Sequence, residues 1–160
     1  MTPEKFTQLT KKLDIHSINL MSHEVNIRDD YVPSNVNKIE GIQQSFSGIA
    51  GVSKGENEII YRFKAGVRVM SSDAPEEALK GAGEGYRILE IKADFNAVYG
   101  FSGELTEDEV QYFSKYNVMY NVWPYWREFV QNTCYRMNVP ALKIPFLCRG
   151  TQGEGEKSPE

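Results

Sequence analysis

Cysteine and histidine are scarce in this sequence, and their scarcity argues against two kinds of site. The chain of 160 residues has two cysteines, Cys134 and Cys148, and two histidines, His16 and His23. Two cysteines in a chain without an export signal do not indicate a disulfide framework. Nothing matches the ligand spacing of a zinc site, and two residues at this odd spacing on a strand face opposite sides of the sheet. We therefore expect two reduced thiols, no metal site and no cofactor.

Long apolar runs and excess positive charge are also missing. No stretch approaches the roughly 18 apolar residues that a membrane span needs, and residues 1–14 lack the apolar core of a signal peptide. The formal net charge is −4, whereas surfaces that bind nucleic acid are basic. We expect a cytoplasmic protein that neither inserts into membranes nor binds nucleic acid.

Motifs for catalysis are absent as well. The glycines Gly81, Gly83 and Gly85 resemble a phosphate-binding loop only superficially, because they precede a strand and lack the Lys-Ser/Thr of such loops. The carboxylates of residues 107–109 lie at the start of a predicted helix, where negative charge is favourable. We expect no enzymatic activity, although catalytic residues contributed by distant segments would leave no local motif.

Aromatic residues, by contrast, are abundant. Nine Tyr, eight Phe and two Trp make up 12% of the chain. This is more than the core of such a domain needs, so we expect some of them to serve a second purpose. The length suits one domain, and we predict a single domain over residues 1–148 with a flexible polar tail over residues 149–160.

The first half of the chain has the patterns of two strands. Residues 13–27 alternate polar and apolar side chains but change parity near Ser17, which predicts a bulge or bend there. Residues 28–37 read as a crossing loop that carries Tyr31. Residues 38–52 form a second, weakly patterned strand.

Two clearer strands follow. After a turn over residues 53–57, apolar residues alternate with polar ones as expected of a strand with one buried face. The apolar positions are Tyr61, Phe63, Ala65, Val67 and Val69. Residues 71–85 are a polar loop with one helical turn, and residues 86–99 form the fourth strand. We predict an antiparallel sheet with one face to be covered.

The cover for this face comes from the C-terminal part of the chain. Thr106 and Glu109 have the spacing of a capping box, which predicts a helix over residues 107–117. A longer helix follows with an apolar stripe at helical spacing: Val118, Val122, Tyr125, Trp126, Phe129, Val130, Thr133 and Met137. Pro124 predicts a kink or the start of a new helix, and prolines bracket an extended piece over residues 140–145. The fold class is α+β: a four-stranded antiparallel sheet with a long C-terminal helix packed on one face.

Residues 121–146 resemble the signature of the SecB family of protein-export chaperones. In that family a long helix opens with aromatic-Pro-Tyr-x-Arg-Glu, and a later Arg leads into a Pro-bracketed extension. The matching residues here are Trp123, Pro124, Tyr125, Arg127, Glu128, Arg136, Val139, Pro140, Ala141 and Leu142. The resemblance covers roughly residues 13–147.

This resemblance implies a chaperone that works without ATP or a cofactor. It implies assembly as a homodimer or homotetramer and clients that are non-native polypeptides, such as unfolded preproteins, held in long apolar grooves. The motif assigns Tyr125 and Phe146 to the groove. Position and apolarity add Tyr31, Ile39, Ile42 and Phe46.

The sequence also departs from the family. Family members continue into a second C-terminal helix that helps to dock the SecA motor, whereas this sequence ends in a polar stretch. Of the acidic residues that the family presents to SecA, Glu24 and Glu90 have counterparts here. A dedicated member, for example one that protects an antitoxin client, would show this kind of loss.

Three functions therefore stay open from the sequence. The first is a general export chaperone, and the second is a chaperone for one client such as an antitoxin. The third, from another class, is a small-ligand binding or enzymatic α+β domain, for which a closed pocket with converging polar groups would be the distinguishing feature.

Overall fold

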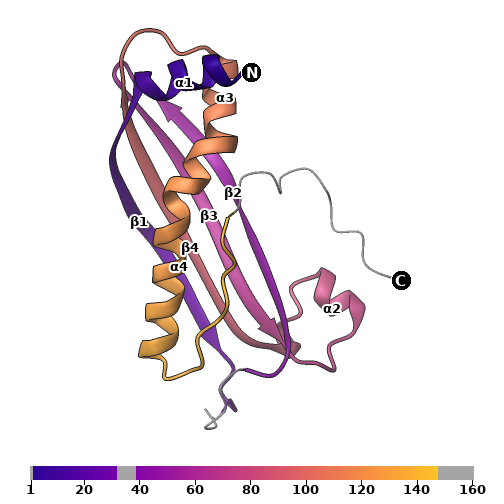
Figure 1. Ribbon diagram of the computed structural model, residues 1–160. Coiled ribbons are helices and arrows are strands. Elements are labelled where there is room, and N and C mark those ends of the chain that lie inside the picture. Colours follow the sequence, from indigo (N-terminus) through magenta and orange to yellow (C-terminus); the bar gives the residue numbers. More distant parts are fainter. Residues whose placement is uncertain (1, 32–38, 148–160) are drawn as a thin grey trace.

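One antiparallel sheet of four strands organises the structure (Figure 1). The computed structural model describes residues 2–31 and 39–147. The strands are β1 (Leu13–Ile27), β2 (Ile42–Lys54), β3 (Glu58–Met70) and β4 (Arg87–Phe101). Their spatial order is β1-β4-β3-β2. Strands β1 and β2 are therefore the two edges of the sheet within the described residues.

Helices form a second layer on one face of this sheet (Figure 1). The helices of this layer are α1 (Pro3–Lys12), α3 (Glu107–Phe113) and α4 (Met119–Arg136), whereas the short α2 (Glu76–Lys80) contacts Gln44 and Arg68 on the opposite face. Between α3 and α4 lies a π-helical turn (Ser114–Val118), so the chain stays helical from Glu107 to Arg136. The predicted α+β fold class is confirmed.

The start of α3 is as predicted, but the irregularity in the long helix is not. Thr106 accepts a hydrogen bond from the Glu109 amide, and the Glu109 carboxylate accepts one from the Thr106 amide, which completes the capping box. Pro124 lies inside α4, so the alternative of a new helix at this residue is wrong. Proline removes one helical hydrogen bond, and the packed face of α4 tolerates that loss. The helical hydrogen-bond pattern departs from α geometry earlier, in the π-turn over Ser114–Val118, where the bonds span five residues instead of four.

Strand β1 has the predicted bounds and the predicted bulge. Its pairing with β4 shifts register between Ile15 and Ser17, and again between Leu20 and Ser22. The second shift was not predicted. Strand β2 begins at Ile42, four residues later than the weak pattern suggested.

The two histidines lie on opposite faces of the sheet, as their spacing predicts. The His23 ring packs edge-on against Phe129 of α4, with 5.5 Å between the ring centroids. His16 lies on the other face, where its Nδ1 is 3.2 Å from Oε1 of Glu58.

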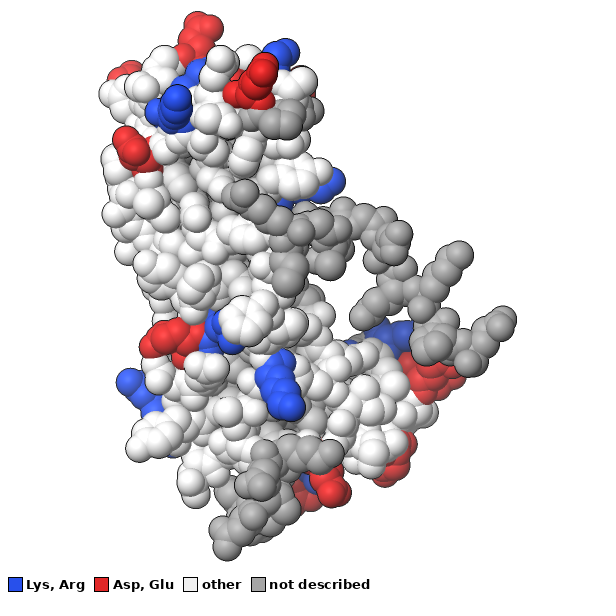
Figure 2. Space-filling model, in the orientation of Figure 1, with Lys and Arg blue, Asp and Glu red and all other residues white. Residues whose placement is uncertain are grey.

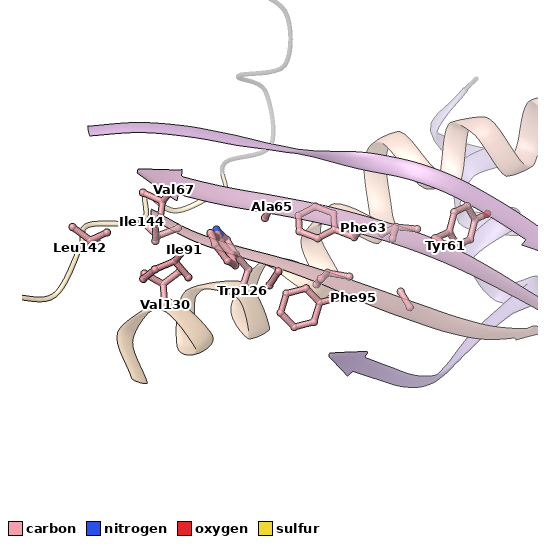
Figure 3. Close-up of a cluster of buried hydrophobic side chains, with 14 of the residues drawn as sticks. Tyr61, Phe63, Ala65, Val67, Ile91, Phe95, Trp126, Val130, Leu142 and Ile144 are labelled. Atoms are coloured by element: carbon pink, nitrogen blue, oxygen red, sulfur yellow. The ribbon is translucent and has the colours of Figure 1, made fainter. Parts of the chain in front are cut away.

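The core lies between the sheet and the α3–α4 layer (Figure 3). The alternating residues predicted for the third strand, Tyr61, Phe63, Ala65, Val67 and Val69, are all buried. Helix α4 contributes Val122, Trp126, Val130 and Cys134 at helical spacing. Burial raises the pKa of the Cys134 thiol, and this cysteine is free.

Some predictions fall outside the described residues. These are the flexible tail over residues 149–160, the state of Cys148 and most of the crossing loop. Within residues 2–31 and 39–147, no helix is long and apolar enough to cross a membrane.

Candidate functional site

Strand β2 is open on both faces. None of its residues is buried, because α4 packs over β3 and β4 and stops short of this edge. No charged side chain occurs from Ile42 to Ser53, although charges are a usual protection for an exposed edge. The helical face therefore has a region between β2 and the helices α3 and α4 that no described helix covers, and we call this region the channel.

One half of the channel is filled by residues 139–147, which we call the strap. The strap is extended, without helix or strand, as its prolines predict. It runs back along α4 toward the start of that helix (Figure 1). Its Leu142 and Ile144 are buried in the same cluster as Val67 and Ile91 of the sheet (Figure 3).

Three side chains hold the strap by its backbone carbonyls. From β2, Gln43 Nε2 donates to the Lys143 carbonyl at 2.9 Å. From α4, Arg127 Nε donates to the Ile144 carbonyl at 3.2 Å and Trp123 Nε1 donates to the Pro145 carbonyl at 2.8 Å. Both walls of the channel therefore contact the strap.

The other half of the channel is an open cleft of about 400 Å³. It lies beside α3 and the π-turn, which precede Trp123 in the chain, so it continues the strap's path beyond Pro145. Its lining residues are Ile49, Ala50, Gly51, Val52, Lys54, Glu107, Val110, Gln111 and Ser114. A register shift between Ile49 and Gly51 bends β2 at this point.

At the boundary between the two halves, Phe146 projects from the strap into solvent. Its side chain is 76% exposed, and the guanidinium carbon of Arg127 lies 4.1 Å from the centroid of its ring. This cation–π contact and the hydrogen bond to Ile144 give Arg127 two roles at the strap. Glu128 instead accepts from Asn132, so the neighbouring Arg127 and Glu128 have separate partners.

Charged side chains at this region are Lys54 and Glu107 in the cleft lining, Arg127 beside the strap and Lys143 in it. On the helical face, Lys, Arg, Asp and Glu gather near the α1 end and in the lower half, while the band between them is largely uncharged (Figure 2). Exposed apolar side chains at the channel are those of Val52 and Phe146.

The opposite face of the sheet has a smaller cleft beside Phe46. It measures about 250 Å³ and is lined by Gln44, Ser45, Phe46, Val67, Arg68 and Glu90. Phe46 is 56% exposed, and Ile42 is partly exposed on the same face, since both alternate with Gln43. Arg68 fixes one wall of this cleft, because its guanidinium donates to Gln44 and to the carbonyls of residues 79, 81 and 82.

The structure therefore separates the predicted groove residues. Tyr31 and Ile39 are partly buried against the core, while Ile42 and Phe46 lie on the face away from the helices. Phe146 is at the channel.

Tyr125 lies on the other side of α4 from Phe146. Arg127 contacts Phe146, and two residues along a helix correspond to a rotation of about 200°. Tyr125 is 48% exposed and faces the β1 side of the molecule. Tyr125 and Phe146, which the motif assigns to one groove, are thus on two different surfaces of this subunit.

The two predicted docking carboxylates lie on the face away from the helices. Lys92 Nζ is 2.9 Å from Glu90 Oε2 and 4.0 Å from Glu24 Oε2. Glu90 also accepts from Arg87 at 2.9 Å and is buried, whereas Glu24 is exposed.

Six aromatic residues are buried in the core, namely Tyr61, Phe63, Phe95, Tyr99, Phe113 and Trp126. The rings of Tyr61, Tyr99 and Phe113 pack against one another. Burial raises the pKa of both Tyr61 and Tyr99. These three rings therefore belong to the core, where two long buried strands under a long helix accommodate much aromatic volume.

Comparisons with known proteins show which fold this arrangement resembles. No family model matches the chain, and no curated protein matches its sequence. Among solved structures, it is similar to the Mycobacterium tuberculosis Rv1957 SecB-like chaperone, solved in complex with a ChAD peptide from the Rv1956 HigA1 antitoxin. The TM-score is 0.69 over 90% of this chain and 97% of that one, at 15% sequence identity.

The chain has the SecB-like fold. The resemblance read from residues 121–146 is confirmed at the level of the fold. A protein of unknown function from Streptococcus agalactiae is more distant, with a TM-score of 0.41 and 8% identity over 84% of this chain and 98% of that one.

Sequence reasoning missed the donors that line the channel. Trp123 and Arg127 were identified through the motif, but their contacts with the strap were not predicted, and Gln43 was not singled out. The signal that was available is the pair of prolines around residues 140–145. An extended segment next to an apolar helix needs partners for its backbone carbonyls.

Proposed function

We propose that this protein is an ATP-independent holdase chaperone that binds non-native polypeptides in the cytoplasm and has no catalytic role. The observation that carries the proposal is the open channel beside β2, where apolar side chains stay accessible although the protein has a complete core. Its fold, shared with a SecB-like chaperone solved with a peptide bound, supports the same function.

Exposed apolar surface suits this task physically. Large contiguous apolar patches on soluble proteins mark sites of interaction, and apolar contacts impose little sequence specificity. Each contact is weak, but several contacts along one client add up through avidity. Phe46, Tyr125 and Phe146 are the most exposed aromatic members of the predicted groove set, and we propose that clients contact them. Tyr31, Ile39 and Ile42 contribute smaller exposed areas.

The client is an extended segment of a non-native chain, either an antitoxin or an unfolded preprotein. The paired charges on the outer face favour a dedicated client. Lys92 lies between Glu24 and Glu90, Arg87 also pairs with Glu90, and Lys64 Nζ lies 3.3 Å from Asp94. A face with so little free negative charge is a weak attractant for a basic docking partner. If SecA binds, Glu24 and Glu90 are the residues we propose for its docking.

We further propose that the protein forms homodimers through β1, which pair into homotetramers. This edge strand has exposed apolar residues along its length, namely Ile15, Leu20, Met21 and Ile27. A strand at a sheet edge has unpaired backbone groups, and an antiparallel copy of itself satisfies them symmetrically. Tyr125 faces this side of α4 and would then lie near the subunit contact.

An aggregation assay tests the chaperone proposal. A chemically unfolded client is diluted into buffer with the purified protein and without ATP, and light scattering is followed while size-exclusion chromatography reports the oligomer. We expect scattering to be suppressed at near-stoichiometric protein and a species larger than 18.2 kDa. A monomer that leaves aggregation unchanged would disprove the proposal.

The alternative of a small-ligand or enzymatic domain lacks a comparable observation. Such a site is a deep pocket with converging polar groups, whereas both clefts described above are open to solvent.

A further inference from the structure

The strap occupies the channel in the manner of an extended peptide in a binding groove. It is extended, and its Leu142 and Ile144, two residues apart, point into the core while Lys143 between them is exposed. This alternation is that of a chain with one face in a groove. In the described residues the strap pairs with no strand.

The three hydrogen bonds that hold the strap are made to its backbone, so they do not depend on its sequence. Gln43, Arg127 and Trp123 donate to three successive carbonyls, those of residues 143, 144 and 145. Every residue has a carbonyl, so these donors accept any extended segment that fits. The strap's own side chains contribute further contacts: Val139, Leu142 and Ile144 are buried in the cluster that contains Val67 and Ile91, and the Phe146 ring contacts Arg127.

The open cleft lies directly beyond the strap in the same channel. No described residue fills this cleft, so a foreign segment that enters there meets Phe146 and then the strap as it continues along the channel. Binding over the full length therefore requires the strap to leave.

We propose that the strap is the resident occupant of a peptide-binding channel, and that an extended client segment with apolar side chains two residues apart takes its place on the same three donors. This inference rests on the proposed function and specifies its site and client chemistry. The exchange is balanced at these positions, because the client replaces the buried Leu142 and Ile144 side chains and the three hydrogen bonds with equivalents.

Because the strap is part of the same chain as the channel, the length of a client peptide determines whether it can displace the strap. A tethered segment competes at an effective concentration in the millimolar range, so a peptide no longer than the strap displaces it poorly. A longer segment also occupies the open cleft, and this additional contact surface drives the exchange. We expect affinity to rise sharply once a client peptide spans both halves of the channel.

Locking the strap tests the exchange. Gln43→Cys and Lys143→Cys, combined with Cys148→Ser, are bridged by dibromobimane; Cys134 is buried and stays in place. Binding of a fluorescent, chemically unfolded client is measured by anisotropy. The bridged protein should bind at least about tenfold more weakly than the same protein before bridging. Glu76→Cys with Lys80→Cys on α2, also in the Cys148→Ser background and bridged in the same way, is the matched control and should bind like the parent.

The outcomes separate the two proposals. Equal affinity before and after bridging overturns the strap exchange and leaves the chaperone function standing. Failure of the parent and of every variant to bind any client overturns both.

A second variant gives an effect of opposite sign. Ile144→Ala shortens a side chain of the strap while Gln43, Arg127 and Trp123 remain available to a client. We expect client affinity to increase severalfold, because the competitor is weakened, with circular dichroism confirming that the protein stays folded. Unchanged or reduced affinity in the folded variant would contradict the exchange.

Discussion

The ring of Phe46 lies over Gly66 of the neighbouring strand, so closely that a β-carbon at position 66 would overlap the ring. The two residues are register partners in the β2–β3 ladder. Glycine at position 66 thus lets an exposed aromatic ring lie against the sheet on the face away from the helices.

Gly66→Ala should reveal this coupling. Alone, it should destabilise the protein by about 1–3 kcal/mol, because the methyl group displaces the ring. In a Phe46→Ala background the same change should stabilise it by up to about 1 kcal/mol, since alanine lowers the entropy of the unfolded chain. Urea unfolding of the four proteins in this double-mutant cycle measures both effects. The same sign in both backgrounds would show that the ring does not depend on Gly66.

Phe146→Ser should weaken client binding without unfolding the protein. The ring is largely exposed, so its loss costs little stability, whereas an aromatic contact in an interface is worth more than about 1 kcal/mol, or roughly fivefold in affinity. Anisotropy with a labelled unfolded client gives the affinity. Tyr135→Ser is the control, because Tyr135 is 85% exposed near the far end of α4. Equal losses from both variants would remove Phe146 from the binding surface.

A charge on the β1 edge should dissociate the proposed oligomer. In the double variant Leu20→Lys and Met21→Lys, two cations replace exposed apolar side chains on an edge strand, which is a common protection against strand pairing. Light scattering coupled to size-exclusion chromatography should show a shift toward the monomer. Val52→Lys on the opposite edge is the comparison and should leave the mass unchanged. A mass unaltered by the β1 variant would place the subunit contact elsewhere.

Alkaline pH should destabilise the fold through its buried tyrosines. Burial, and then the charges of Tyr99 and Glu107, raise the pKa of Tyr61 far above its ordinary value of 10.0. The folded state therefore keeps a proton that the unfolded state loses. The associated stability is fully present below about pH 10 and declines as the pH rises from there toward the folded pKa.

Tyr61→Phe removes the ionisable hydroxyl, so the stability of this variant should fall less steeply as the pH rises above about 10. The hydroxyl donates to the Val110 carbonyl at 3.3 Å, so at pH 7 the substitution should cost about 1 kcal/mol or less. Urea unfolding between pH 7 and pH 11 compares the slopes, with the exposed Tyr135→Phe as reference. Parallel curves for the parent and Tyr61→Phe would refute this assignment.

Local patterns were sufficient to predict most of the fold. Strict alternation fixed the buried face of β3, and the capping box fixed the start of α3, because both signals arise from neighbours in the sequence. Strand β2 was harder to delimit, since it buries no residue and its glycines and serines carry no alternation.

The candidate site depended on contacts that local patterns do not encode. Whether Tyr125 and Phe146 share a surface is decided by how the strap returns along α4, and Gln43 meets Lys143 only in the folded chain. The motif identified Trp123 and Arg127 as important, but their hydrogen-bond acceptors lie about 20 residues further along. The face on which Phe46 lies, by contrast, follows from strand parity once β2 is recognised.

The two bulges of β1 make this strand tolerant of changes in length. From Leu13 to Ile27 it spans 15 residues, and it pairs with a shorter stretch of β4 because His16 and Met21 have no counterpart there. Deleting either residue restores regular alternation without turning any other side chain to the opposite face. Proteins of this fold can therefore gain or lose a residue at either position and still present the same side chains to the helices, so an alignment with one or two gaps in this strand remains compatible with a common structure.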